Sequence, residues 1–208
     1  MNSIFIPGPV GRLELLISAE QTHSKNGVAI ICHPHPLFGG AMHNKVVTTL
    51  ARTFESLGLV SVRFNYRGVG KSEGTYGEGK GEIEDLLVVM SWANAKYPGS
   101  ELWLAGFSFG ACVAASAAVL HDTAQLILVA PAVQHFSLND LPPLQSPCLV
   151  IQGEQDEIVH PNAVYQWVAS RDPQPMLIRL PDAGHFFHGQ LMVLREKLIE
   201  IFHLLVGP

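Results

Sequence analysis

Short apolar runs alternate with stretches of helical periodicity along this chain. The apolar runs lie at residues 28–32, 60–64, 102–105, 126–130, 149–152 and 176–180. Patterns of helical period lie between them, at about residues 42–57, 80–96, 109–120, 161–169 and 189–205. Strands that alternate with helices in this way predict an α/β fold, with a mostly parallel sheet and helices on both of its faces.

The first residues follow a different pattern. Residues 5–7 and 13–17 favour strands, and Gly8, Pro9 and Gly11 lie between them, which predicts an antiparallel hairpin. With the six later strands, this hairpin makes an expected sheet of eight strands. No repeat, low-complexity tract or linker interrupts the pattern. We therefore expect residues 1–208 to form a single domain, which is long enough to bury a core.

The composition excludes some classes of protein. Hydrophobic residues make up 48% of the chain and charged residues 15%, which is typical of a folded globule and not of a disordered chain. The net charge is −5, and the 13 lysines and arginines are scattered along the sequence. A nucleic acid partner is therefore not expected.

Three features favour a cytoplasmic location. Cys32, Cys112 and Cys148 lie in strand or helix patterns, as small buried apolar residues do in a reducing compartment. The first seven residues lack the basic start and apolar core of a signal peptide. The uncharged stretch 102–120 is interrupted by Gly106 and Gly110, so we read it as a strand and a helix and expect no membrane span.

The strongest chemical signal is Gly106-Phe107-Ser108-Phe109-Gly110, which lies between an apolar strand and an alanine-rich helix. A serine on a tight strand-to-helix turn is a nucleophile elbow, which exposes the hydroxyl to a substrate. The glycines suit the close packing of strand and helix, where a Cβ would collide. Ser108 is therefore the candidate nucleophile.

A serine hydroxyl needs a base, and the base needs a third group to orient it. Asp156 follows one strand pattern and His185 follows the last one, so both are expected at the carboxyl edge of the sheet with Ser108. The order Ser, Asp, His is the one that this topology imposes. Glu154, Glu157 and Asp182 are alternatives to Asp156, but Asp182 is only three residues from His185 and is poorly placed to orient its ring.

Two backbone N–H groups are expected to form an oxyanion hole. One belongs to Phe109, the residue after the nucleophile. The other should come from the loop 33–40, where Pro34 and Pro36 have no N–H to donate. Leu37 is preferred as this donor, and His35 is the alternative.

The same loop raises the question of a metal site. His33 and His35, with His43 or His188, could in principle hold zinc. No carboxylate or cysteine shares a ligand-like spacing with the pair, so neither a metal nor another cofactor is expected.

These motifs resemble the α/β-hydrolase superfamily, and more narrowly the small lidless bacterial serine hydrolases related to dienelactone hydrolases and carboxylesterases. The resemblance is carried, in the same order along the chain, by residues 33–36, 39–40, 65–72, 106–110, 153–156 and 184–187. Many relatives have His-Gly in the oxyanion loop, where this chain has His33-Pro34. A dienelactone hydrolase would have a cysteine at the elbow, where this chain has Ser108, which argues against that activity.

Superfamily members with a cap domain insert it where this chain has only residues 131–147. The prolines of this segment favour an extended loop, so we expect no cap and an open site. Residues 65–81 are rich in glycine and are a candidate mobile loop. Arg67 within it is expected either to bond nearby backbone or, less favourably, to bind a substrate carboxylate.

The resulting hypothesis is a serine hydrolase that cleaves carboxylic esters or related small acyl compounds through an acyl-enzyme on Ser108. A peptidase or amidase of the same fold is an alternative, and so is a non-catalytic member that binds a ligand. The expected partner is a small acyl substrate. The sequence leaves open whether the protein is a monomer or a dimer.

Overall fold

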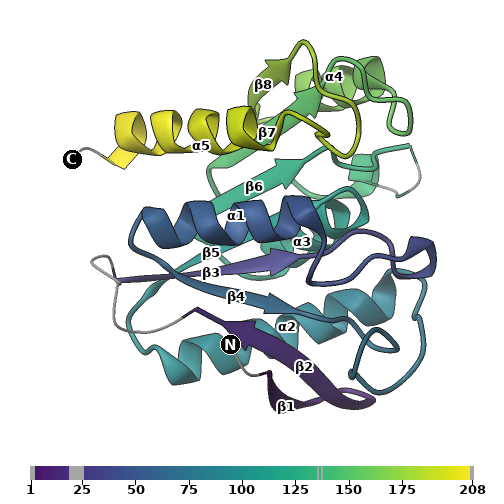
Figure 1. Ribbon diagram of the computed structural model, residues 1–208, viewed down its shortest axis with the longest axis vertical. Helices are drawn as coiled ribbons and strands as arrows, with labels where there is room; N and C mark the ends of the chain where they lie inside the picture. Colours follow the sequence, from purple (N-terminus) through teal and green to yellow (C-terminus); the bar gives the residue numbers. More distant parts are fainter. Residues whose placement is uncertain (1–2, 19–25, 135, 137, 207–208) are drawn as a thin grey trace.

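The computed structural model describes residues 3–18, 26–134, 136 and 138–206. Eight strands lie close to their predicted positions: β1 (Ile4–Gly8), β2 (Gly11–Ile17), β3 (Gly27–Cys32), β4 (Val60–Phe64), β5 (Glu101–Phe107), β6 (Gln125–Val129), β7 (Cys148–Gly153) and β8 (Met176–Leu180). They form one sheet in the order β1-β2-β4-β3-β5-β6-β7-β8 (Figure 1). The predicted eight-stranded sheet is confirmed.

Strand direction also follows the prediction. The hairpin pairs β1 with β2 antiparallel, and β2 joins the rest of the sheet antiparallel to β4. From β4 through β3, β5, β6 and β7 to β8, every neighbouring pair is parallel. The carboxyl ends of these six strands therefore meet at one edge of the sheet, where open α/β folds place their ligands.

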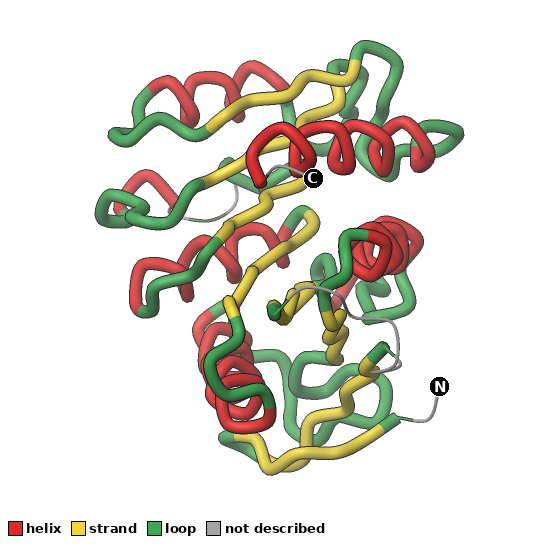
Figure 2. Tube along the Cα trace, turned by 90° about the vertical axis from the view of Figure 1, so that its left-hand side faces the viewer, coloured by secondary structure: helices red, strands yellow, loops and turns green. Residues whose placement is uncertain are grey.

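Five helices cover the sheet: α1 (Lys45–Ser56), α2 (Lys80–Lys96), α3 (Phe109–Leu120), α4 (Pro161–Ala169) and α5 (Leu191–Val206). Figure 2 shows them on both sides of the strands. Buried side chains of α1 and α5 form the apolar cluster on one face, whereas those of α2, α3 and α4 belong to the cluster on the other. Successive strand residues supply the two clusters in turn, as with Ile30 and Ile31 in β3.

Helix α3 fits closely against the middle of the sheet because its buried face is built from small side chains. Ala111, Ala114 and Ala115 are completely buried there. This alanine-rich packing places the amino terminus of α3 directly beside the carboxyl end of β5.

Among the described residues, no helical cap is inserted between β6 and β7. The described residues of this connection contain only a short 3₁₀ helix, η3 (Leu138–Asp140). The uncharged stretch 102–120 divides into β5 and α3, and no helix in the described ranges is long and apolar enough to cross a membrane.

Candidate active site

Ser108 lies in a sharp turn between β5 and α3. Its backbone has φ 55° and ψ −115°, outside the regions that most residues occupy, and its N–H donates to Val129 O over 2.8 Å. A Cβ on Gly106 would lie 2.1 Å from Gly110 O, and one on Gly110 would lie 2.4 Å from Cys32 O. Only glycine fits at either position, so the predicted reason for both glycines agrees with the packing.

The Ser108 hydroxyl is the first member of a hydrogen-bonded chain of three side chains. Its Oγ lies 3.1 Å from His185 Nε2, and His185 Nδ1 lies 2.9 Å from Asp156 Oδ2 and 3.1 Å from Oδ1. A carboxylate can only accept, so Nδ1 carries the ring proton and Nε2 is left to accept from the serine. In the neutral ring, Nε2 is thus an acceptor that lies directly beside the Ser108 hydroxyl.

The Asp156 carboxylate is held by several donors besides His185. Its Oδ1 accepts from the N–H groups of Ile158 and Val159 over 2.9 and 2.7 Å, and its Oδ2 accepts from Gln152 Nε2 over 2.9 Å. Burial alone raises the pKa of Asp156, but the bonds and charge of His185 and the two N–H groups outweigh it and lower the pKa below its ordinary value. Asp156 therefore remains ionised. Sequence reasoning missed Gln152.

The three alternative acids lie elsewhere. Glu157 accepts the backbone N–H of His185 over 3.1 Å and so fixes the main chain that carries the ring. Glu154 and Asp182 are exposed and are not part of the hydrogen-bonded chain in the described structure. The preference for Asp156 as the partner of the ring thus agrees with the geometry.

The loop after β3 is shaped by its two histidines. His33 is buried; its Nδ1 donates to Pro34 O over 2.7 Å, and its Nε2 accepts from Tyr66 N–H over 3.2 Å. Burial lowers the pKa of His33 to about 4 although its bond to Pro34 O opposes the shift, so the ring stays neutral at neutral pH. Both ring nitrogens of His33 are therefore used in hydrogen bonds to the backbone.

The backbone N–H of Leu37, the preferred oxyanion donor, already has a hydrogen-bond partner. This N–H donates to His35 Nδ1 over 3.2 Å within the 3₁₀ turn η2 (Pro36–Phe38), and Leu37 as a residue is 67% exposed. Leu37 lines neither of the two clefts beside Ser108, whereas His35 lines both. Phe109 is the first residue of α3, where an N–H has no acceptor within its own helix.

Two clefts meet at Ser108. One has a volume of about 380 Å³, and the residues that line it but not the other cleft include Gly39, Gly40, Asn44, His185 and Phe186. The other has a volume of about 570 Å³ and is lined by Tyr76, Glu78, Phe109, Ala132, Phe136 and Val159. His35, Phe38 and Ile158 border both. Volumes of this size are ordinary for small-molecule sites.

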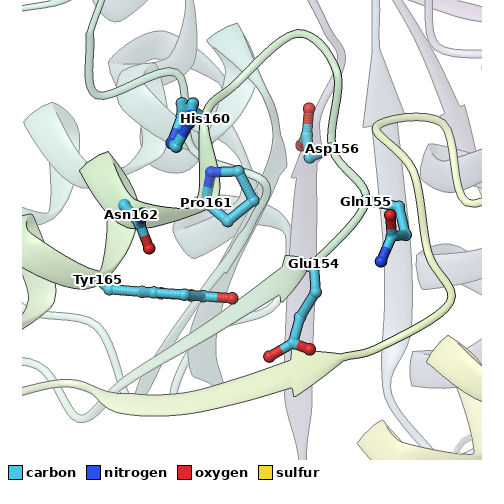
Figure 3. Close-up of a pocket in the computed structure, with 7 residues that line it drawn as sticks. All are labelled: Glu154, Gln155, Asp156, His160, Pro161, Asn162 and Tyr165. Carbon is cyan, nitrogen blue, oxygen red and sulfur yellow. The ribbon is translucent and has the colours of Figure 1, made fainter.

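A third cavity, of about 490 Å³, lies between the end of β7 and the start of α4 (Figure 3). Asp156 is its only residue from the hydrogen-bonded chain; the others are Glu154, Gln155, His160, Pro161, Asn162 and Tyr165. Neither Ser108 nor His185 lines it, so this cavity opens behind the carboxylate and away from the serine hydroxyl.

The structure corrects two expectations about residues 65–81. Arg67 is buried, and its guanidinium is directed neither to nearby backbone nor to a substrate. It forms ion pairs with buried Asp85, over 2.8 Å, and with Glu84, over 3.0 Å. The candidate mobile loop is anchored, because Glu14 Oε2 accepts from Asn65 Nδ2 and from Lys71 N–H, each over 2.9 Å. These partners come from distant parts of the chain, which local sequence reading does not reveal.

The three cysteines do not have the lowered pKa of a nucleophilic thiol. Cys32, Cys112 and Cys148 are free thiols, and burial raises the pKa of each to about 12. Within the described ranges, no group of three or more His, Cys, Asp or Glu side chains is placed to hold a metal ion.

Comparison with known proteins agrees with this architecture. The family model described as Serine aminopeptidase, S33, matches residues 24–146. An α/β serine hydrolase homologue from Coxiella burnetii is 47% identical, with a TM-score of 0.93 and 96% of each chain covered. XC6422 from Xanthomonas campestris, a serine hydrolase without a lid, is 42% identical, with a TM-score of 0.94, 100% of this chain and 95% of that chain covered.

The fold extends to more distant enzymes. The esterase Pf2001 from Pyrococcus furiosus is 18% identical, with a TM-score of 0.80 over 97% of this chain and 91% of that one, a likeness that shows the fold alone. The resemblance drawn from the sequence motifs is confirmed. The chain belongs to the α/β serine hydrolase superfamily, as a lidless member that matches the serine aminopeptidase S33 family.

Proposed function

We propose that the protein hydrolyses carboxylic esters or related small acyl compounds through an acyl-enzyme on Ser108. The observation that carries the proposal is the continuous hydrogen-bonded chain from Ser108 Oγ through His185 to Asp156. His185 takes the proton of Ser108 as Oγ attacks the acyl carbon. It then gives that proton to the departing alcohol, and the same ring activates the water that releases the acid.

Asp156 supports this cycle without changing its own protonation. Its carboxylate fixes the proton on Nδ1 and stabilises the imidazolium that forms in each half of the reaction. The donors from Gln152, Ile158 and Val159 support this role, because they keep the carboxylate ionised and in place.

For the oxyanion hole we propose the N–H groups of Phe109 and His35. Phe109 begins α3, so the helix dipole adds to its effect on a developing negative charge. His35 is favoured over the initial choice of Leu37 because it borders both clefts at Ser108, while the Leu37 N–H is bonded to the His35 ring.

The proposal is tested with an active-site-directed fluorophosphonate. One phosphonyl group should add to the intact protein, and peptide mapping should find it on Ser108. The Ser108→Ala variant should lose both the label and ester turnover, while Cys112→Ala, which removes the nearby buried thiol, should keep both. Labelling that persists in Ser108→Ala, or that maps to Cys112, would contradict the proposal.

A peptidase is the second candidate, because the matching family model is described as a serine aminopeptidase. Glu78 supports it: this exposed carboxylate lines the cleft at Ser108 and could bind the ammonium of an N-terminal residue. Phenylalanyl amides with and without a free α-amino group separate the two candidates. An aminopeptidase cleaves only the amide that has a free α-amino group. An esterase cleaves the ester that corresponds to either amide faster than it cleaves the amide itself.

A further inference from the structure

The two clefts at Ser108 differ in chemistry. We call the one lined by Asn44, His185 and Phe186 the histidine cleft. We call the other, lined by Tyr76, Phe109 and Phe136, the aromatic cleft. An ester substrate has two halves, one on each side of the carbonyl that Ser108 attacks, so each cleft is available to one half.

Proton transfer decides which half goes where. The departing oxygen must receive a proton from His185 Nε2, so the leaving group has to lie on the side of the ring. His185 lines the histidine cleft and not the aromatic cleft. With the alcohol in the histidine cleft, the acyl substituent extends on the opposite side of Ser108, along Phe109 and into the aromatic cleft.

The aromatic cleft is walled by rings that contact one another. The ring centroids of His35 and Phe109 are 4.8 Å apart, those of Phe109 and Phe136 are 4.9 Å apart, and those of His35 and Tyr76 are 5.0 Å apart. The planes are tilted or perpendicular, so ring edges and faces both border the space. Such surfaces favour a flat ring, whose face and edge find complementary partners, over a puckered aliphatic group.

A hydroxyl also lines this wall. His35 Nδ1 accepts from the Leu37 N–H, so in the neutral ring the proton is on Nε2, which donates to Tyr76 Oη over 3.1 Å. With its oxygen accepting from His35, the Tyr76 hydroxyl can donate its own proton to an acceptor on a substrate. The cleft can thus hold a ring and also hydrogen-bond a polar substituent on the acyl group.

We propose that the aromatic cleft selects an acyl group with a planar aromatic ring and that the histidine cleft receives the alcohol. This assignment rests on the proposed esterase function. It makes Phe136 a specificity-determining residue, since of the two clefts at Ser108 it borders only the aromatic one, and it contacts Phe109 at the base of the nucleophile elbow.

The first test compares three para-nitrophenyl esters that share one leaving group: phenylpropanoyl, cyclohexylpropanoyl and trimethylammoniobutanoyl. We expect kcat/KM for the phenyl ester to exceed that for the cyclohexyl ester by about fivefold, the size expected of one or two ring contacts. A cyclohexyl ester that reacts equally well overturns the proposal. A preferred trimethylammonium ester also overturns it, since the rings and Glu78 would then bind a cation.

The second test locates the selectivity. Phe136→Leu should reduce the phenyl-to-cyclohexyl ratio to near one, whereas Phe186→Leu, the matched change in the histidine cleft, should keep that ratio. All esters of one acid share one acyl-enzyme, so Phe136→Leu should slow deacylation equally whatever the alcohol. Phe186→Leu should instead alter acylation in a manner that depends on the alcohol. The reverse pattern would show that the two clefts are assigned the wrong way round.

Labelling separates this inference from the proposed function. If the fluorophosphonate reacts with Ser108 but the aryl preference is absent, only the assignment of the clefts fails. If Ser108 is not labelled, the proposed function fails as well. Stoichiometric labelling of Phe136→Leu at Ser108, at whatever rate, shows that the variant is folded and that its nucleophile is intact.

Discussion

Two histidines at the same edge of the sheet show how similar surroundings support different roles. His33 follows β3 and is fully buried, and His185 follows β8 and is 3% exposed. Each uses both of its ring nitrogens in hydrogen bonds. The partners of His33 are backbone groups, whereas the partners of His185 are a carboxylate on one side and a hydroxyl on the other.

This difference determines what each ring can do. Burial holds His33 neutral, and its bonds to the carbonyl of Pro34 and the N–H of Tyr66 tie the loop after β3 to the segment that follows β4. In the proposed reaction Asp156 instead provides a negative charge that stabilises an imidazolium at His185, and Ser108 provides a proton for the ring to take. Burial and satisfied hydrogen bonds therefore do not identify a base; the chemistry of its partners does.

Replacing each of the two histidines in turn should give the largest difference in kcat between two variants. We expect His185→Ala to lower kcat by on the order of 10⁶-fold, because the serine then has no base. His33→Gln, which keeps an amide able to accept from Tyr66 N–H, should cost no more than about tenfold. Steady-state turnover of a para-nitrophenyl ester measures both, with circular dichroism as the control for folding. Equal losses in the two folded variants would contradict the distinction.

The carboxylate partner can be tested in the same way. Asp156→Asn should lower kcat by about 10⁴-fold, since an amide no longer holds the proton on Nδ1 of His185. Asp182→Asn makes the same change at an exposed carboxylate near the ring and should leave kcat within about twofold. A large loss in Asp182→Asn with a small one in Asp156→Asn would move the acid of the triad to the loop after β8.

The titration of His33 should affect the free energy of unfolding, although His33 is expected to have little effect on turnover. Its pKa is about 4 in the folded protein and near 6.5 when unfolded, so between these values the unfolded chain binds the proton. The free energy of unfolding is then fully retained above pH ~6.5 and falls by up to ~3 kcal/mol as pH drops through the folded pKa near 4. Urea unfolding across this range measures the loss.

His33→Gln is the control for that titration, because glutamine has no proton to gain. The variant should show a shallower decline of stability between pH ~6.5 and ~4 than the parent protein does. Parallel curves for the two proteins would assign the decline to other groups. Asp156 does not produce the same signal, since its lowered pKa places its contribution at more acidic pH.

The sequence predicted the parts of the site whose signals are local. The elbow around Ser108 is specified by neighbouring glycines and by the strand and helix on either side. The positions of Asp156 and His185 follow from strand ends, because parallel strands bring their carboxyl ends to one edge. The same local signals placed all eight strands and the five helices close to their observed bounds.

What the sequence could not predict depends on distant partners or on loop shape. Arg67 was interpreted from its own loop, but its partner is Asp85 on α2. The anchoring of Asn65 comes from Glu14 on the opening hairpin, 51 residues away. The sequence also does not show that the turn η2 directs the Leu37 N–H to the His35 ring, which bears on the choice between Leu37 and His35 as oxyanion donor.

The smallest expected effect concerns metals, and it also separates the histidines. Both ring nitrogens of His33 are bonded to backbone groups, so a metal bound there would have to break the contacts that shape the loop. We therefore expect EDTA to leave kcat/KM within about 1.5-fold of its starting value, and zinc added in slight excess over EDTA to restore nothing. Initial ester hydrolysis rates before chelation, after it and after zinc addition test this. Activity lost to EDTA and recovered with zinc would make the His33 and His35 loop a metal site and would leave the assignment of His185 as the sole base without support.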